Sequence, residues 1–295
     1  MTGNPRLPAR SPERAEPRGE ESLMARYGLS TWIVAELPLD EAIEALVASG
    51  FAQVELSADR SALVKAWEAD PESVSARMVG LGFSLPSVHS PEPGRFLDAR
   101  DEAEREASIA ANLRYFDRMK ACDIPEIVIH PISADWAALG EPRQVAWERI
   151  IDALSRLAER AGAMGLRMAV ENLGADPALG ASTASLLEMI AGLGDHVGLC
   201  LDIGHTVLAG LDPVAEWRTA VSVRKAFSLH LHDVDDRNRD HFVPGEGRVD
   251  FEAFLSEVDR AEFNGGRILE ISPPASNVGD RLREVSSVRR RWEAR

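Results

Sequence analysis

Short apolar runs alternate with longer segments of helical periodicity along the chain from residue 27 onward. Eight runs stand out, and their sequences are YGLSTWIV, AQVELS, FSLPSVHS, EIVIHP, RMAVENL, VGLCLDIGH, AFSLHLHD and GRILEIS. Unbroken apolar runs are typical of parallel strands, because helices cover both faces of a parallel sheet. Several runs follow a glycine or proline, which commonly separates the end of a helix from the next strand. The pattern predicts repeated strand–helix units.

The segments between the runs carry apolar residues at helical spacing. In ASTASLLEMIAGLG, positions i, i+3, i+4 and i+7 of one helix face are Leu186, Met189, Ile190 and Leu193. Ser185, with Glu188 three residues later, predicts a capping box at the start of this helix. Eight strand–helix units in roughly 250 residues match the number of units and the typical length of a (β/α)8 TIM barrel.

A doubly wound open sheet is the alternative fold. That fold usually carries a glycine-rich phosphate loop after a strand, and no such loop follows any of the eight runs. We therefore expect one α/β domain, a (β/α)8 TIM barrel, over residues 23–295. Residues 1–22 are dominated by proline, arginine and glutamate, so we expect a disordered N-terminal extension there.

Composition narrows the functional classes. No run of 18 apolar residues is present, which argues against a membrane span. The two cysteines, Cys122 and Cys200, form no CxxC pair, and such sparse usage fits a reducing cytoplasm. The net charge of −15 would repel phosphate backbones. We expect a cytoplasmic protein that binds neither membranes nor nucleic acids.

Active sites of barrel enzymes lie at the C-terminal ends of the strands. Nearly every predicted strand ends in a residue that can bind a metal or transfer a proton, and these are Glu55, His89, His130, Glu171, Asp202 with His205, His230 with His232, and Glu270. Structural roles remain open for some of them. Glu55 suits a helix cap or an ion pair equally well, and His89 and His130 suit hydrogen-bonded positions at the rim.

Four of these residues follow four consecutive strands: Glu171, Asp202, His230 and Glu270. Three carboxylates held close together inside an apolar barrel cannot all stay ionised unless a cation neutralises them. The set therefore predicts one bound divalent metal ion. Hard oxygen ligands with a single nitrogen favour Mn²⁺, Mg²⁺ or Co²⁺, and Zn²⁺ is also possible.

The segment HLHDVDDRNRDHF, residues 230–242, contains three histidines. His230 and His232 are two apart on a predicted strand, so they face the same side. We expect one to reach the metal and the other to face substrate or solvent. His241 lies just before the turn Pro244–Gly247, which could bring it back over the barrel mouth.

Motifs in a fixed order link these residues to a known group: VELS, VENLG, LDIGH, HLHD, PGEGRVDF and LEIS. From about residue 25 to the C-terminus the chain resembles the xylose isomerase-like barrel superfamily of sugar isomerases and epimerases. The resemblance implies the same metal ligands, Glu171, Asp202, His230 and Glu270. The family usually has lysine or asparagine where this chain has His232. Sugar epimerases of the group also use an arginine near this point, and Arg237 is close but out of register.

One relative in that superfamily, the bacterial apurinic endonuclease, binds three zinc ions with additional histidines and an aspartate. The residues that match those additional histidines are His89, His130, His205 and His241. The aspartate is replaced by Arg239, with Asp240 one position away. This loss and the negative charge argue against a nuclease.

The leading hypothesis is a metal-dependent isomerase or epimerase of carbohydrate metabolism that acts on a small, sugar-like polyhydroxylated carbonyl compound. A metal that chelates the carbonyl and a neighbouring hydroxyl would stabilise an enediolate. Glu171 and Glu270 would act as base and acid. Trp32 and Trp136 could stack on the apolar face of a sugar, although Trp32 equally suits rim packing. The residues expected to contact substrate are Trp32, His89, His130, His205, His232 and His241.

Three alternatives remain at this point. A dehydratase acting on a cyclic polyol ketone or a dehydroshikimate-like acid would use the same enolate chemistry. An apurinic endonuclease-like phosphodiesterase would bind three metal ions rather than one. A non-catalytic sensor is disfavoured, because the full carboxylate set is costly to keep without a metal. Barrels of this kind often form dimers, so a homodimer is possible.

Overall fold

The computed structural model describes residues 26–295, apart from residues 58–59, 133–139, 174–175 and 275–276. The expected N-terminal extension of residues 1–22, and Trp136, lie outside the described residues. The strands are β1 Gly28–Ser30, β2 Val54–Glu55, β3 Ser87–His89, β4 Glu126–Ile129, β5 Arg167–Glu171, β6 Val197–Asp202, β7 Ala226–Leu231 and β8 Gly266–Leu269. Their ladders are parallel throughout.

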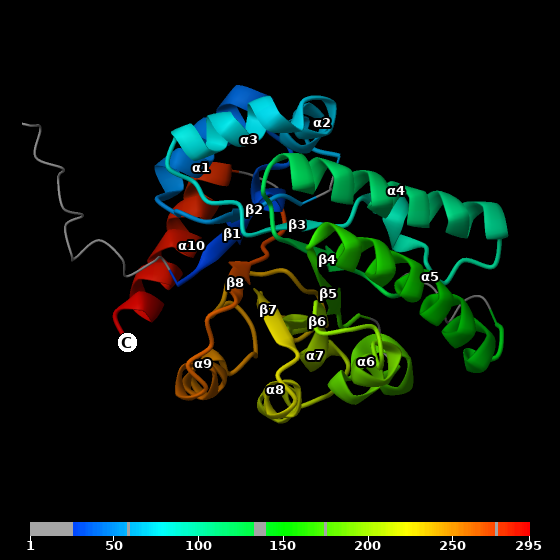
Figure 1. Cartoon of the computed structure of the whole chain (residues 1–295). Coiled ribbons are helices and arrows are strands. Elements are labelled where there is room, and N and C mark those ends of the chain that lie inside the picture. The colour runs from blue at the N-terminus through cyan, green and yellow to red at the C-terminus, as the bar shows by residue number, and fades with distance from the viewer. Residues whose placement is uncertain (1–25, 58–59, 133–139, 174–175, 275–276) are drawn as a thin grey trace, which may run out of the picture.

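The strands form a nearly closed barrel. Their hydrogen-bonded order is β2-β1-β8-β7-β6-β5-β4-β3, and isolated parallel bridges, Gln53 to Ser84 and Leu56 to Val88, join the two end strands. Figure 1 shows the helices arranged around the outside of these strands. The predicted (β/α)8 TIM barrel is confirmed.

Ten α-helices lie in the described part of the chain: α1 Leu39–Ser49, α2 Ala62–Ala69, α3 Pro71–Gly80, α4 Glu102–Ala121, α5 Arg143–Met164, α6 Thr183–Met189, α7 Ile203–Leu208, α8 Pro213–Ser222, α9 Phe251–Arg260 and α10 Val278–Glu293. Shorter helical turns follow three strands, and these are η1 Thr31–Val34, η2 Glu92–Arg95 and the irregular η4 Pro177–Ala181. No helix among the described residues is both long and apolar enough to cross a membrane.

Two apolar clusters hold the barrel together. The large one lies where the helices pack on the strands, and the small one contains Val128, Ala169 and Cys200, all fully buried. Residues two apart on a strand share a face, so Ala169 lies on the same side as Glu171, and Cys200 on the same side as Asp202. The small cluster is therefore an apolar layer directly below the charged strand ends.

The start of α6 differs from the sequence-based prediction. The helix begins at Thr183, and its cap is Ser182, whose side chain accepts the Ser185 N–H at 3.2 Å. The predicted cap, Ser185, lies inside the helix, where its hydroxyl accepts the Gly180 N–H at 2.8 Å. The irregular turn before the helix needs this acceptor, and single-sequence periodicity does not reveal such a turn.

Candidate metal centre and cavity

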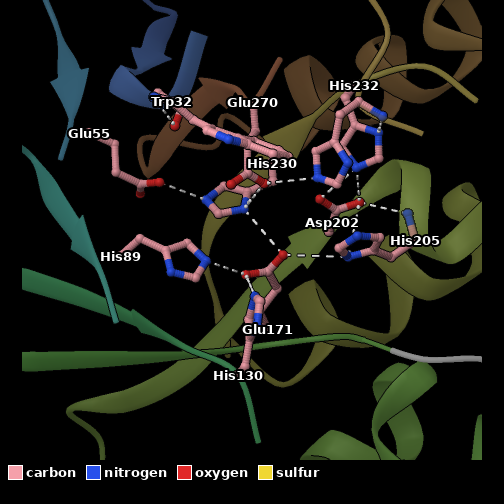
Figure 2. Close-up of polar contacts among 12 residues, drawn as sticks. Trp32, Glu55, His89, His130, Glu171, Asp202, His205, His230, His232 and Glu270 are labelled. Carbon is pink, nitrogen blue, oxygen red and sulfur yellow. Dashed lines mark hydrogen bonds and ion pairs between the residues drawn. The ribbon is translucent and has the colours of Figure 1, made fainter. Parts of the chain in front are cut away.

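The four predicted metal ligands meet at the C-terminal ends of β5 to β8 (Figure 2). Glu171 and Asp202 end β5 and β6, His230 lies on β7, and Glu270 directly follows β8. Nδ1 of His230 is 3.0 Å from Glu270 Oε2 and 3.3 Å from Glu171 Oε1. One ligand atom from each of the four residues lies within 4.8 Å of the others, a gap of the size that encloses a metal ion.

Burial makes this arrangement electrostatically demanding. Glu171, Asp202 and His230 are fully buried, and Glu270 is 5% exposed. Within the described residues, the ion-pair partners of these carboxylates are all histidines; no arginine or lysine reaches them. Oxygen-rich, nearly cation-free surroundings of this kind fit a divalent ion well.

Charges at the centre shift the pKa values of its acidic and basic side chains in opposite directions. Burial alone would raise the carboxyl pKa values, but nearby histidine charges outweigh it and hold the pKa of Glu171 and of Glu270 well below the ordinary range. Burial opposes protonation of His230, yet surrounding acidic groups, Glu270 among them, raise its pKa well above its usual value. Protons on histidines thus do the work that a bound divalent cation can take over.

Glu55 lies at the Nε2 side of the His230 ring, opposite to the Nδ1 side that faces Glu171 and Glu270. Its Oε1 lies 3.2 Å from His230 Nε2, and within the described structure both buried atoms lack a hydrogen-bond partner. The second oxygen of Glu55 accepts the Ser87 hydroxyl at 2.6 Å. When Nδ1 of a histidine binds a metal, Nε2 carries the proton, and a carboxylate commonly accepts it. The Glu55 carboxylate thus lies where the acceptor of a metal-bound His230 would be needed, and this placement supports the fit of the site to a metal.

The sequence did not assign Glu55 to this role. Its position at the end of β2 was visible in VELS, but a cap or an ion pair explained it equally well. Only the three-dimensional barrel, which places β2 beside His230, reveals the partner.

His232 is placed behind Asp202 rather than in the cavity. Its Nε2 lies 2.9 Å from Asp202 Oδ1, and its Nδ1 accepts the backbone N–H of His241 at 3.0 Å. A backbone amide can only donate, so the neutral ring must carry its proton on Nε2 and point it at Asp202. Burial lowers the pKa of His232, which favours this neutral form. The side chain is fully buried and fixes the orientation of the Asp202 carboxylate, a candidate metal ligand.

The LDIGH motif makes room for this histidine. A Cβ added to Gly204 would lie 1.9 Å from the His232 ring, far inside van der Waals contact. Asp202 also caps α7 by accepting the His205 N–H at 2.7 Å. One short segment thus supplies a candidate ligand, the start of α7 and the space for the histidine that orients Asp202.

Other predicted histidines surround the metal centre. His89 and His130 place their Nε2 atoms 3.3 Å and 3.1 Å from Glu171 Oε2. Nδ1 of His205 faces the Asn172 carbonyl oxygen at 3.2 Å. Burial, the largest influence, lowers the pKa of His130 to about 4, so this ring is neutral near pH 7.

His241 closes the centre from the loop after β7. Its Nδ1 is 3.1 Å from Asp240 Oδ1, and its Nε2 is 3.7 Å from Glu270 Oε2. The residue has a φ of 59°, the left-handed region that non-glycine residues rarely adopt. The predicted return of His241 over the barrel mouth is therefore observed. Arg237, by contrast, is solvent-exposed, and the structure does not place it in the wall of the cavity.

A cavity of about 1020 Å³ opens above the centre. This volume lies at the upper end of the range for small-molecule sites. The predicted site residues in its wall are Trp32, His89, His130, His205, His241 and Glu270. The Trp32 ring packs edge-on against His241 with centroids 4.7 Å apart, so it contacts the rim and borders the cavity at once. Glu270 is the one predicted metal ligand that lines this cavity within the described residues.

An eight-stranded barrel with a buried carboxylate–histidine cluster beneath such a cavity is an architecture that can hold a divalent metal ion. The chain belongs to the xylose isomerase-like TIM barrel family, whose model matches residues 43–288. The resemblance seen in the motifs is thereby confirmed.

Curated relatives with similar sequences include enzymes of different activities. Inosose dehydratase of Lacticaseibacillus casei is 28% identical over 42% of this chain and 46% of its own length. A probable endonuclease 4 of Chloroflexus aurantiacus is 31% identical over 54% of this chain and 60% of its own. The 3-dehydroshikimate dehydratase of Pseudomonas aeruginosa is 27% identical over 84% of this chain, but only 39% of its own length. The chain thus spans about half the length of these relatives.

Solved structures share the fold at lower identity. A D-tagatose 3-epimerase-like protein superposes with a TM-score of 0.73 at 18% identity, covering 90% of this chain and 97% of that one. A zinc-bound IolI protein gives a TM-score of 0.73 at 17% identity, covering 91% of this chain and 96% of its own. At such identities the likeness establishes the barrel fold alone.

Proposed function

We propose that the protein is a divalent-metal-dependent enzyme that isomerises or epimerises a small polyhydroxylated carbonyl compound. One observation carries the proposal: Glu171, Asp202, His230 and Glu270 converge, buried, on a gap of ionic size beneath an open cavity. Membership of the xylose isomerase-like family and the fold shared with a D-tagatose 3-epimerase-like protein support it.

The metal would be held by the same four residues, with Glu55 and His232 orienting His230 and Asp202. Bound there, a divalent cation would polarise a carbonyl group and stabilise the negative charge that develops when a neighbouring carbon loses its proton. The donor set admits Mn²⁺, Mg²⁺, Co²⁺ and Zn²⁺, and the zinc-bound IolI protein makes zinc a strong candidate.

Proton transfer is assigned to Glu171 and Glu270. They extend from β5 and from the end of β8, with β6 and β7 between them, so they approach a substrate from different sides. One carboxylate removes a proton from the carbon next to the carbonyl, and the other delivers a proton to the opposite face, which epimerises that carbon. Return of the proton to the former carbonyl carbon isomerises the compound instead, because the adjacent hydroxyl passes its proton to the former carbonyl oxygen and becomes the new carbonyl.

The surrounding side chains would bind and orient the hydroxyl groups. His130, His205 and His241 border the cavity and lie next to the ligand carboxylates. The low pKa of His130 keeps its ring neutral, so it can bind a hydroxyl without adding charge. Trp32 offers an aromatic face or edge to the apolar side of the substrate.

The direct test is solvent deuterium exchange into a panel of ketoses, cyclic polyol ketones and polyhydroxylated keto acids, incubated with metal-loaded protein in D₂O. We expect deuterium at the carbon next to the carbonyl in one of these compounds. E171Q and E270Q should each slow exchange by about 10²-fold or more, because each removes a general acid–base group. R218Q, which alters a surface ion pair with Glu257, is the matched control and should exchange normally. Full exchange by E171Q and E270Q would refute the assignment.

A dehydratase is the second candidate, favoured by similarity to inosose dehydratase and to 3-dehydroshikimate dehydratase. Instead of regaining a proton at carbon, the enolate can eliminate a neighbouring hydroxyl group, which leaves as water when the acid of the pair protonates it. A conjugated product that absorbs in the ultraviolet would identify elimination. Exchange of deuterium into recovered starting sugar, without such a product, would identify epimerisation.

A nuclease remains the third candidate because of the endonuclease relative. Arg239, at the position of the missing aspartate, pairs with Asp235 at 2.6 Å. Asp240 instead turns toward His241 Nδ1 at 3.1 Å and His205 Nε2 at 4.0 Å. We therefore favour one metal ion over three, and metal counting distinguishes the two.

A further inference from the structure

Three arginines border the cavity, and one of them differs from the others. Arg60 forms an ion pair with Glu92, and Arg100 donates from Nε to Glu141 Oε2 at 3.1 Å. Arg95 makes no hydrogen bond or ion pair with any described residue, and its Nε is buried. A buried guanidinium N–H without an acceptor is costly, so it is kept where something else supplies the acceptor.

The position of Arg95 links it to the metal centre. It ends η2, the short turn that follows β3, and β3 carries His89. Arg95 and His130 line the same cavity, and Nε2 of His130 lies 3.1 Å from Glu171 Oε2. A group bound by Arg95 would thus lie beside the metal centre, on its β3–β4 side, within the same cavity.

We propose that Arg95 binds a carboxylate group of the substrate, so that the substrate is a polyhydroxylated carbonyl acid and not a neutral sugar. This inference rests on the proposed function, because it names the compound on which the metal centre acts. The planar guanidinium matches a carboxylate through two parallel N–H···O bonds, and such charge-assisted pairs are among the strongest in proteins.

Several features favour a carboxylate over a phosphate dianion. The described residues of the cavity wall include no lysine, and Arg95 is the one arginine there without an acidic partner in the described structure. The same wall carries the acidic residues Glu92, Asp98, Asp101 and Glu104. These carboxylates would repel a second negative charge more strongly than a single one.

The test measures binding of three inert probes to the full metal-loaded chain by calorimetry. Quinate carries a carboxylate on a hydroxylated ring, quinamide is its neutral counterpart, and myo-inositol 1-phosphate carries a phosphate. We expect quinate to bind about ten to a hundredfold more tightly than quinamide, the difference that hydrogen bonds to a charged group make. Equal binding of quinate and quinamide, or tightest binding of the phosphate, would overturn the proposal.

Variants of Arg95 test whether this residue causes the preference for quinate over quinamide. R95Q should bind quinate no better than quinamide while it keeps its affinity for quinamide, which shows that the cavity is intact. R95K retains the positive charge but loses the two parallel N–H groups of the guanidinium, so it should keep part of the preference for quinate. This variant also tests the role of Arg95 if R95Q does not fold. R100Q, a change in the same wall at a paired arginine, should keep the full preference. A preference that survives in R95Q would refute the role of Arg95.

The two proposals fail in different ways. If quinate binds through Arg95 but no ketose or keto acid exchanges deuterium, the proposed function is wrong and the carboxylate site stands. If a neutral ketose exchanges deuterium and quinate shows no preference, the carboxylate site is wrong and the proposed function stands.

Discussion

At the residue scale, the proposed metal centre depends on its four candidate ligands and also on the side chains that orient those ligands. The sequence indicated Glu171, Asp202, His230 and Glu270, because carboxylates and a histidine at consecutive strand ends need a shared cation. It did not indicate Glu55 as the partner of His230, nor His232 as the partner of Asp202. Both assignments depend on which nitrogen of the imidazole ring faces the carboxylate, and this depends on the groups that surround each ring in the fold.

The role of His232 predicts an effect on metal affinity. H232A removes the N–H that orients Asp202, so the metal should bind about 10- to 100-fold more weakly, as is usual when a group behind a ligand is lost. H232Q can still donate from its amide nitrogen and should retain most of the affinity. Competition with a chromophoric chelator measures both.

The control for this change is H196Q. His196 bonds the Ala158 carbonyl oxygen at 2.8 Å, in a turn between α6 and β6, remote from the metal centre. Metal affinity of H196Q should match that of the unaltered protein. Equal affinity of H232A and H196Q for the metal would contradict the positioning role.

The buried histidines also predict a pH-dependent stability of the metal-free protein. Burial opposes their protonation, yet acidic neighbours raise the pKa of His205 to about 9 and of His241 to about 10. Unfolding returns both to about 6.5, so their stabilisation is complete below pH 6.5 and is lost as pH rises toward 10. Urea unfolding in a chelator should show the midpoint falling across this range, and less so in H241Q. A midpoint that rises with pH would contradict the assignment.

At the element scale, the strands were predicted more reliably than the turns that join them to helices. Apolar runs located all eight strands, because burial on both faces leaves a strong pattern even where β2 is only two residues long. The cap of α6 was misplaced, because the irregular turn Pro177–Ala181 starts the helix earlier than its apolar face suggests. Local hydrogen bonds determine where a helix begins, and the apolar periodicity of the sequence does not reveal these bonds.

The junction of β6 and α7 gives a prediction at this scale. G204A places a methyl group against the buried His232 ring, so either the ring or the helix must move. We expect about 1–3 kcal/mol of destabilisation from overpacking, together with weaker metal binding. Thermal unfolding and the chelator competition measure the two effects.

G80A is the matched control, since a Cβ added to Gly80 meets no atom within 4 Å. Gly80 ends α3, where alanine is at least as favourable as glycine, so stability should be unchanged or slightly higher. If G204A behaves like G80A, the close packing of Gly204 on His232 is not important.

At the scale of the whole molecule, the barrel turns strand ends that are distant in sequence into one site. Glu55 and Glu270 are 215 positions apart, yet both lie next to His230 because β2, β1, β8 and β7 are successive neighbours. Strand order in a barrel follows from the repeat, so the meeting of the ligands was predictable. The cavity and the unpaired Arg95 were not, since the segments between strands and helices shape them. A homodimer stays a prediction.

Metal content of the purified chain tests the central claim most directly. Elemental analysis after dialysis against a mixture of Mn²⁺, Mg²⁺, Co²⁺ and Zn²⁺ should find about one divalent ion per chain, and none in a folded D202N/E270Q variant. Three ions per chain would point to the nuclease-like arrangement. No bound ion, or one that persists after both ligands are replaced, would contradict the metal centre and the chemistry assigned to it.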